Sequence, residues 1–245
     1  ANNLGTKGLL IEGASHGYVT NVTVDYSKNE AFKIRKNSQY WEFLNCQAKH
    51  PGASGLGYGE GFYVSDADQN WTVTPDNTGY ITFAGCVVYK ATNDGFDLKE
   101  GSHHIKIVGC RVDYANIETA NTRGANGVYA RANYCQVINS QLENNLNCND
   151  GGWLVLANDT VASNGVNYGN NIDIKNSRVV NSICQGDANR SNVLIRNDVV
   201  TARVYSDCST SYTGTQPSRP SASTFTEMTW SGVGGGIYGT TYFAF

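Results

Sequence analysis

Hydrophobic and polar residues alternate in short segments that recur along most of the chain, and these segments show no helical period. Alternation of this kind is typical of β-strands that bury one face. One set of segments predicts strands at 9–12, 32–35, 62–65, 96–99, 128–131, 153–156 and 193–196. A second set predicts strands at 19–24, 41–46, 81–86, 105–110, 136–140 and 172–177. The chain therefore alternates between two kinds of strand.

A short motif leads into four strands of the first set. It reads NEAFK at 29–33, GEGFY at 59–63, NDGFD at 93–97 and ANGVY at 125–129, and successive copies begin 30, 34 and 32 residues apart. A repeat of this length with β-type alternation indicates the stacked coils of a parallel β-helix. We predict an all-β, right-handed parallel β-helix, a solenoid of about seven coils. It forms a single domain over 1–245 with an irregular C-terminal cap from about 208 to 245.

Alignment of the first strands places apolar residues in two columns that face the core. The first column contains Phe32, Phe62, Phe96, Val128, Trp153 and Val193. The second contains Ile11, Ile34, Val64, Leu98, Ala130, Val155 and Ile195. Side chains alternate between the two faces of a strand, so the residues between and after these columns are predicted to point outward. Those outward residues are Lys33, Tyr63, Asp97, Tyr129, Arg35, Ser65, Lys99 and Arg131.

Three of the seven cysteines occupy the same place at the end of successive second strands, namely Cys46, Cys86 and Cys110. Ser140 follows them in the next coil. A free cysteine packs as a small hydrophobic residue, so this pattern predicts a ladder of small side chains inside the solenoid. The four histidines are scattered, with His103 and His104 in a predicted turn, and their spacing suggests no metal site.

Composition limits the classes of partner. Charged residues make up 16% of the chain, the net charge is −3, and no basic block is present, which argues against nucleic acid as a partner. No apolar run approaches the length of a membrane span, so we expect no membrane partner. The chain opens at Ala1 without a signal peptide, as a mature secreted product or an excised part would. We expect an extracellular monomer.

The repeated motif brings acidic residues together at one bend. Glu60 and Asp94 hold equivalent places in neighbouring coils, Asn93 precedes Asp94, and Asp97 follows on the outward face. Neighbouring strands lie about 4.8 Å apart, and Ca²⁺ takes several oxygen ligands at about 2.3–2.6 Å. The pattern predicts a Ca²⁺ site made by these four residues. The alternative interpretation is a set of solvated acids at a glycine-rich bend.

Basic and aromatic residues flank the acids on the same predicted sheet. Lys33, Arg35 and Tyr63 are candidates for binding an anionic polysaccharide, since basic groups hold carboxylates and flat rings pack on sugars. Long loops at about 65–79 and 157–170 leave one edge of this sheet and are expected to wall the face. A salt-bridged surface with ordinary stacking of aromatic rings is the alternative.

The segments 93–98 (NDGFDL), 104–110 (HIKIVGC) and 126–129 (NGVY) resemble the β-helical enzymes of pectate lyase family 9. The resemblance implies Ca²⁺ binding by the family's acidic segment and by an acid of the preceding coil. Asn93, Asp94, Asp97 and Glu60 take those places. The family's base is a Lys whose place is held here by Tyr129. Lys99 and Arg131, two residues further along their strands, are alternative bases or charge stabilisers.

The resemblance also implies an activity. It suggests a secreted polysaccharide lyase that cleaves a uronate-containing anionic polysaccharide by β-elimination with the assistance of Ca²⁺. A uronate-polymer C5-epimerase is one alternative, because it shares the abstraction of the C5 proton. A non-catalytic glycan-binding or structural β-helix protein is another, favoured by the missing Lys. The residues do not choose among polymers.

Overall fold

The fold is described from a computed structural model. The structure describes residues 7–52, 59–65, 76–115 and 126–144, together with the strands β16 to β22 between residues 153 and 205. These residues form strands, turns and bends, and no helix occurs among them. Residues 66–75, 157–170 and 206–245, with the predicted loops and cap, lie outside the described part. The described part of the chain contains no helix that is long and apolar enough to span a membrane.

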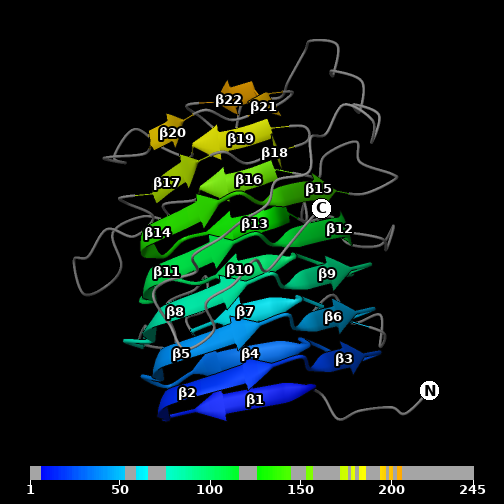
Figure 1. Ribbon diagram of the computed structural model, residues 1–245, viewed down its shortest axis with the longest axis vertical. Helices are drawn as coiled ribbons and strands as arrows, with labels where there is room; N and C mark the ends of the chain where they lie inside the picture. The colour runs from blue at the N-terminus through cyan, green and yellow to red at the C-terminus, as the bar shows by residue number, and fades with distance from the viewer. Residues whose placement is uncertain are drawn as a thin grey trace.

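The strands form three parallel sheets, and the chain visits each sheet in turn (Figure 1). The first sheet contains β1 (Leu9–Glu12), β4 (Phe32–Arg35), β7 (Phe62–Val64), β10 (Phe96–Leu98), β13 (Asn126–Ala130), β16 (Trp153–Leu156), β19 (Ser182–Gln185) and β22 (Arg203–Tyr205). The second contains β2 (Ser15–Thr20), β5 (Gln39–Leu44), β8 (Gly79–Ala84), β11 (His103–Val108), β14 (Asn133–Ile138), β17 (Ile172–Lys175) and β20 (Leu194–Arg196). The third contains β3 (Thr23–Asp25), β6 (Gln47–Lys49), β9 (Val87–Tyr89), β12 (Arg111–Ala115), β15 (Gln141–Asn144), β18 (Arg178–Val179) and β21 (Val199–Val200). The predicted parallel β-helix is confirmed.

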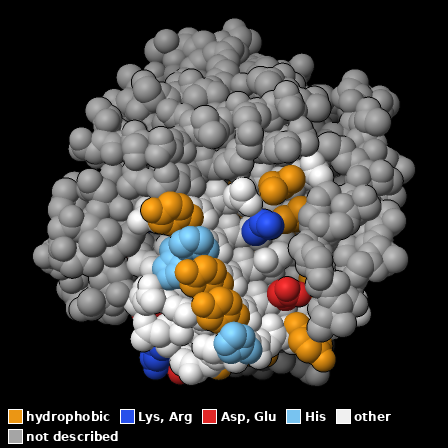
Figure 2. All heavy atoms as spheres, turned by 60° about the vertical axis from the view of Figure 1, so that its left-hand side comes forward, with side chains coloured by type: hydrophobic (Ala, Val, Ile, Leu, Met, Phe, Trp, Pro, Cys, Tyr) orange, Lys and Arg blue, Asp and Glu red, His pale blue; other side chains and the backbone are white. Residues whose placement is uncertain are grey.

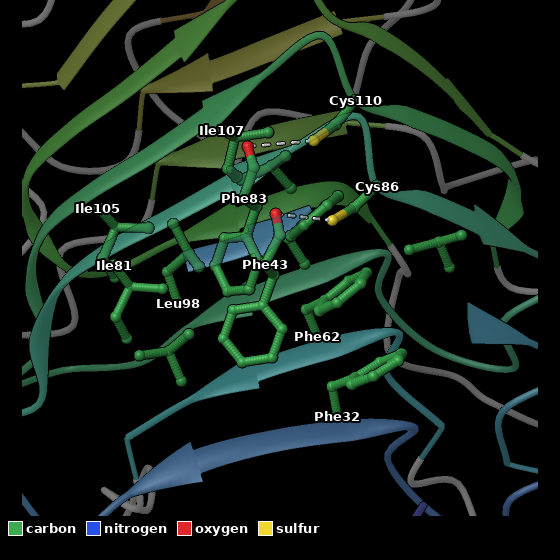
Figure 3. Packing of buried hydrophobic residues seen from close by; sticks show 14 of the residues in the cluster. Phe32, Phe43, Phe62, Ile81, Phe83, Cys86, Leu98, Ile105, Ile107 and Cys110 are labelled. Carbon is green, nitrogen blue, oxygen red and sulfur yellow. Dashed lines mark hydrogen bonds between the residues drawn. The ribbon is translucent and has the colours of Figure 1, made fainter. Parts of the chain in front are cut away.

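The core follows the predicted first column. Phe32, Phe62 and Phe96 are wholly buried and stack along the solenoid, with ring centroids 4.7 and 4.9 Å apart. Phe43 and Phe83 reach them from the second sheet, and the Phe32 and Phe43 rings meet edge to face at 81° (Figure 3). Aromatic pairs of these geometries contribute about 0.5–1.5 kcal/mol beyond their buried area. The repeat thus stabilises itself by placing like rings in successive coils.

The cysteine ladder is also confirmed. Cys46, Cys86 and Cys110 are free thiols and wholly buried. The thiols of Cys86 and Cys110 each donate to a carbonyl of the preceding coil, at Phe43 and Phe83, over 3.4 Å (Figure 3). Ser140 continues the column, because its hydroxyl oxygen accepts the Cys110 N–H at 3.2 Å. Burial and the neighbouring thiols raise the pKa of Cys86 well above its usual value, so the Cys86 thiol stays protonated and unreactive.

The third sheet was not predicted. Its strands are two to five residues long, and β3, β6 and β9 each bury only their central residue. A single buried residue in three cannot show an alternation, so the hydrophobic pattern carried no signal for these strands. Each coil therefore has strands on three sides, whereas the hydrophobic alternation predicts strands on two sides only.

The alignment beyond β13 was wrong in two places. The register shifts between Asn126 and Val128, so that Leu154 pairs with Val128 and takes the position predicted for Trp153. Leu156 likewise takes the place predicted for Val155. The segment 193–196 belongs to the second sheet as β20, while β19 and β22 continue the first sheet. The repeated motif ends at β13, so no motif copy indicates the register of the strands that follow.

Candidate functional site

The repeated motif sets one column of side chains on the outer face of the first sheet. Lys33, Tyr63, Asp97 and Tyr129 occupy the same register position in β4, β7, β10 and β13. Their strand neighbours are buried in the core, so these four side chains project to the other side, as predicted. Lys33 and Asp97 are nevertheless almost fully buried, because the column and its neighbours cover one another.

Three carboxyl groups converge at the start of these strands. Oxygens of Glu60, Asp94 and Asp97 lie within 4.8 Å of one another, and all three residues are buried. Glu60 and Asp94 stand one coil apart, with the Gly61 N–H donating to the Asp94 carbonyl at 3.0 Å. The Asn93 amide nitrogen donates to Glu60 Oε1 at 2.6 Å. The structure therefore brings the four predicted metal ligands to one place.

The environment of this cluster shifts the pKa of Glu60. Burial raises its pKa to about 8, with further contributions from Asp97, Asp94 and Glu30, and the Asn93 hydrogen bond offsets only part of the shift. Its Oε2 is buried without a hydrogen-bond partner. A buried carboxylate without compensation is unfavourable, and either a proton or a cation relieves it. The donor set of carboxylates and an amide side chain fits a hard cation such as Ca²⁺.

Asp97 is already paired with two cations of the protein. Arg131 Nη2 lies 2.7 Å from Asp97 Oδ1, and Lys99 Nζ lies 3.8 Å from Oδ2. Arg131 also contacts Glu100 at 3.1 Å, and its guanidinium lies 4.0 Å from the centre of the Tyr129 ring. Because the Arg131 side chain is only 1% exposed, it acts on the charge of Asp97 and on Tyr129 rather than on a polymer at the surface.

Tyr63 contacts two ammonium groups. Lys33 Nζ is 4.4 Å and Lys99 Nζ is 5.4 Å from the ring centre. Burial, followed by the charges of Asp97 and Glu60, raises the pKa of Tyr63 well above its usual value, so its hydroxyl stays protonated. The ring thus makes cation–π contacts within the protein, as the alternative interpretation of this surface expected.

The remaining predicted binding residues are also paired within the protein. Lys33 lies 3.1 Å from Glu30, and both side chains are buried. Arg35 is bound to Glu12 of the preceding coil. Among the predicted basic residues, the Lys99 side chain is 12% exposed, second only to Arg35. Two interpretations of the basic residues had been left open, a polysaccharide-binding face and a salt-bridged face. The structure shows ion pairs for Lys33, Arg35, Lys99 and Arg131.

Two acids of this network were not predicted. Glu30 holds the same place in its motif copy as Glu60, and it binds Lys7 at 3.5 Å as well as Lys33. The repeat itself could have identified Glu30. Glu100 is wholly buried and pairs with Arg131. It lies in a turn outside the motif, so no repeated pattern pointed to it.

Comparison with known proteins supports the fold. No protein-family model and no curated protein sequence matches the chain. Among solved structures, the crystal structure of an alginate lyase from Paenibacillus sp. str. FPU-7 matches with a TM-score of 0.61. The two chains are 16% identical over an alignment that covers 82% of this chain and 67% of that one. This chain therefore shares its overall architecture with that protein.

Proposed function

We propose that the protein is a secreted, Ca²⁺-assisted polysaccharide lyase that acts on a uronate-containing anionic polysaccharide. The observation that carries this proposal is the buried cluster of Glu60, Asp94 and Asp97, with an unpartnered Glu60 Oε2, beside Tyr129 and Lys99. Two likenesses support it. The segments 93–98 and 126–129 resemble pectate lyase family 9, and the fold resembles that of an alginate lyase.

The proposed cation ligands are Glu60, Asn93, Asp94 and Asp97. The unpartnered Glu60 Oε2 and the mutual repulsion of three carboxyl groups are the features of this chain that a cation would relieve. A bound Ca²⁺ would supply positive charge to the carboxylate of a uronate, which makes the C5 proton more acidic. Asp97 is shared with Arg131 and Lys99, so the cluster carries less net negative charge than three free carboxylates.

The elimination requires a base on the outer side of the cluster. Tyr129 holds the register position next to Asp97, and the Arg131 guanidinium lies 4.0 Å from the centre of its ring. In the proposed step the Tyr129 phenolate, within about 3 Å of the substrate, accepts the C5 proton. The C–H electron pair forms the C4–C5 double bond, and the C4–O4 bond breaks with its pair leaving on oxygen. Lys99 stands next to Asp97 to stabilise the developing charge or to protonate the leaving oxygen.

A non-catalytic glycan-binding protein is the second candidate. Its support is the ion pairing of Lys33, Arg35 and Arg131 within the chain, together with a Tyr at the place of the family's Lys. A C5-epimerase would use the same abstraction and return the proton to the opposite face. The two enzymatic candidates differ in product, because only the lyase creates an unsaturated sugar.

The deciding experiment incubates the protein with pectate, alginate, glucuronan and a glycosaminoglycan, with Ca²⁺ or with EDTA. A lyase produces unsaturated uronates that absorb ultraviolet light, whereas an epimerase changes the C5 configuration seen by NMR without shortening the chain. The variant Asp94→Asn, which keeps the size of the side chain, is expected to lose activity. Retained glycan binding without either product would overturn the lyase and support the binding protein.

A further inference from the structure

A ladder of aromatic and imidazole rings runs along the outer face of the second sheet. It consists of His16, Tyr40, Tyr80, His104 and Tyr134, each the second residue of its strand. Successive rings stack with centroids 4.7, 4.8, 4.7 and 4.8 Å apart. Figure 2 shows histidine and hydrophobic side chains as an oblique row across this face. The row continues over five coils and is separate from the acidic cluster, whose residues lie at the first sheet.

Every residue of this ladder has a positive φ, between 51° and 60°. In a regular strand, two consecutive side chains point to opposite faces. A left-handed residue interrupts that alternation, and it does so here at His104. The consecutive rings of His103 and His104 consequently lie on the same side, with their Nδ1 atoms 2.9 Å apart. Two histidines that sequence reasoning placed in a turn are thus brought together at the edge of β11.

Neighbouring residues hold the His103 ring in place. Its Nε2 lies 2.8 Å from Asn77 Oδ1, an acceptor, so Nε2 carries the proton and Nδ1 presents a lone pair. Gly79 of the preceding coil makes the room, because a Cβ there would lie 2.5 Å from His103 Nδ1. The Tyr80 ring meets His103 edge to face at 5.1 Å. A hydrogen bond from the far nitrogen is the usual support of a metal-binding histidine.

The His104 ring is held by stacking on both faces. Tyr80 lies 4.7 Å away on one side and Tyr134 lies 4.8 Å away on the other. The residue is exposed, and His103 is half-buried, so an ion can reach the pair from solvent. Stacking and hydrogen bonds thus hold two imidazoles at a solvent-accessible place.

We propose that His103 and His104 form a two-nitrogen site for a divalent transition metal ion, Cu²⁺ or Ni²⁺. Nitrogens 2.9 Å apart, each at a metal–nitrogen distance of about 2.0–2.1 Å, subtend an angle of about 90° at the metal. That angle suits adjacent positions of a square-planar or octahedral ion, which Cu²⁺ and Ni²⁺ prefer, better than the tetrahedral Zn²⁺. His104 binds in the tautomer that is protonated at Nε2, and water completes the coordination.

This site is independent of the proposed lyase function. It offers imidazole nitrogens, whereas the cluster of Glu60, Asp94 and Asp97 offers oxygens that suit Ca²⁺. The chain itself supplies conservative variants. Asn133 pairs with His103 in the next coil, and Tyr134 follows it beside His104, so His103→Asn and His104→Tyr introduce residues that the same bend already accepts. His16→Tyr is the matched control, because His16 stacks on Tyr40 in the same ladder beside Ser15 instead of a second histidine.

The test is calorimetric titration of the full chain with Ni²⁺, which does not oxidise the seven cysteines. The wild type and His16→Tyr are expected to bind one ion at this site, and Asp94→Asn is expected to bind it equally well. His103→Asn and His104→Tyr are each expected to weaken binding by more than about 10-fold, the lower limit for loss of an outer-shell partner alone. Thermal unfolding of each variant shows that the fold is kept. No binding by the wild type, or equal affinity in His103→Asn and His104→Tyr, would overturn the proposal.

Discussion

Arg131 Nη2 lies 2.7 Å from Asp97 Oδ1, and this contact joins neighbouring coils inside the protein. The backbone N–H of Arg131 also donates to the Leu98 carbonyl at 2.8 Å. The backbone hydrogen bonds between the two coils therefore continue as far as the residue that makes the ion pair. The Arg131 Nη1 atom lies 3.1 Å from Glu100 Oε1. One buried cation is therefore balanced by two carboxylates, and that balance positions both Asp97 and the Tyr129 ring.

Removal of this cation should be strongly destabilising. Arg131→Met keeps much of the side-chain volume but leaves Asp97 and Glu100 without their shared partner. Breaking a buried pair from one side costs about 3–5 kcal/mol, and urea denaturation is expected to show a loss of this size. Arg35→Met is the matched control, since its pairing with Glu12 is partly exposed, and it should change the urea midpoint far less. Equal midpoints for the two variants would contradict the assigned role of Arg131.

The stability of the protein should fall as the pH rises when no cation is present. The pKa of Glu60 is about 8 in the folded protein, against an ordinary value of 4.5, so between these values the folded state holds one more proton than the unfolded state. Linkage then requires the free energy of unfolding to decrease with rising pH over this range. Melting temperatures measured in EDTA from pH 5 to pH 8.5 test this.

Glu60→Gln provides the control for that pH series, because it keeps the shape of the side chain and removes the titration. Its melting temperature should depend less on pH than that of the wild type, and it should exceed the wild-type value near pH 8.5. A wild-type melting temperature that rises between pH 6 and pH 8.5 in EDTA would show that Glu60 does not govern the dependence.

Calcium should stabilise the protein, and more at pH 8 than at pH 5. The ion and the proton compete for Glu60, so binding strengthens as that carboxyl group ionises. A free Ca²⁺ concentration of 100 times Kd adds about 2.7 kcal/mol to the free energy of unfolding. Asp94→Ala should abolish the rise in melting temperature. Identical melting curves in EDTA and in excess Ca²⁺ would leave the interpretation of a protonated, cation-free bend.

The sequence predicted the parts of the fold that repeat visibly. The Phe32, Phe62 and Phe96 column and the Cys46–Cys86–Cys110 ladder were predicted because each coil repeats the same residue type at the same place. The third sheet was missed because its strands are short, and β3, β6 and β9 bury one residue each. The register of Leu154 was missed because it depends on an irregularity in β13 that no residue type announces.

The candidate site was predicted in its members but not in its surroundings. Glu60 and Asp94 were found because stacked coils superpose equivalent motif positions. The burial of Arg131 depends on Glu100 and Tyr129, whose positions relative to it follow from the three-dimensional fold. The convergence of His103 on His104 depends on a positive φ, which an alternation pattern cannot reveal. The repeat thus predicted which residues come together at the site. Their burial and ion pairing depend on tertiary contacts that the repeat does not show.

Tyr129 is the base of the proposed elimination. An unperturbed tyrosine has a pKa near 10, so Tyr129 needs nearby positive charge to act at neutral pH, and Arg131 lies 4.0 Å from its ring. Tyr129→Phe keeps the ring and its contact with Arg131 and removes only the hydroxyl. It should lower kcat on the cleaved polymer by at least ~100-fold, as expected for loss of a general base, while glycan affinity stays unchanged. Tyr63→Phe is the control, because the pKa of Tyr63 is raised and its hydroxyl cannot serve as a base. Full activity in Tyr129→Phe together with its loss in Lys99→Ala would assign the proton abstraction to Lys99 instead.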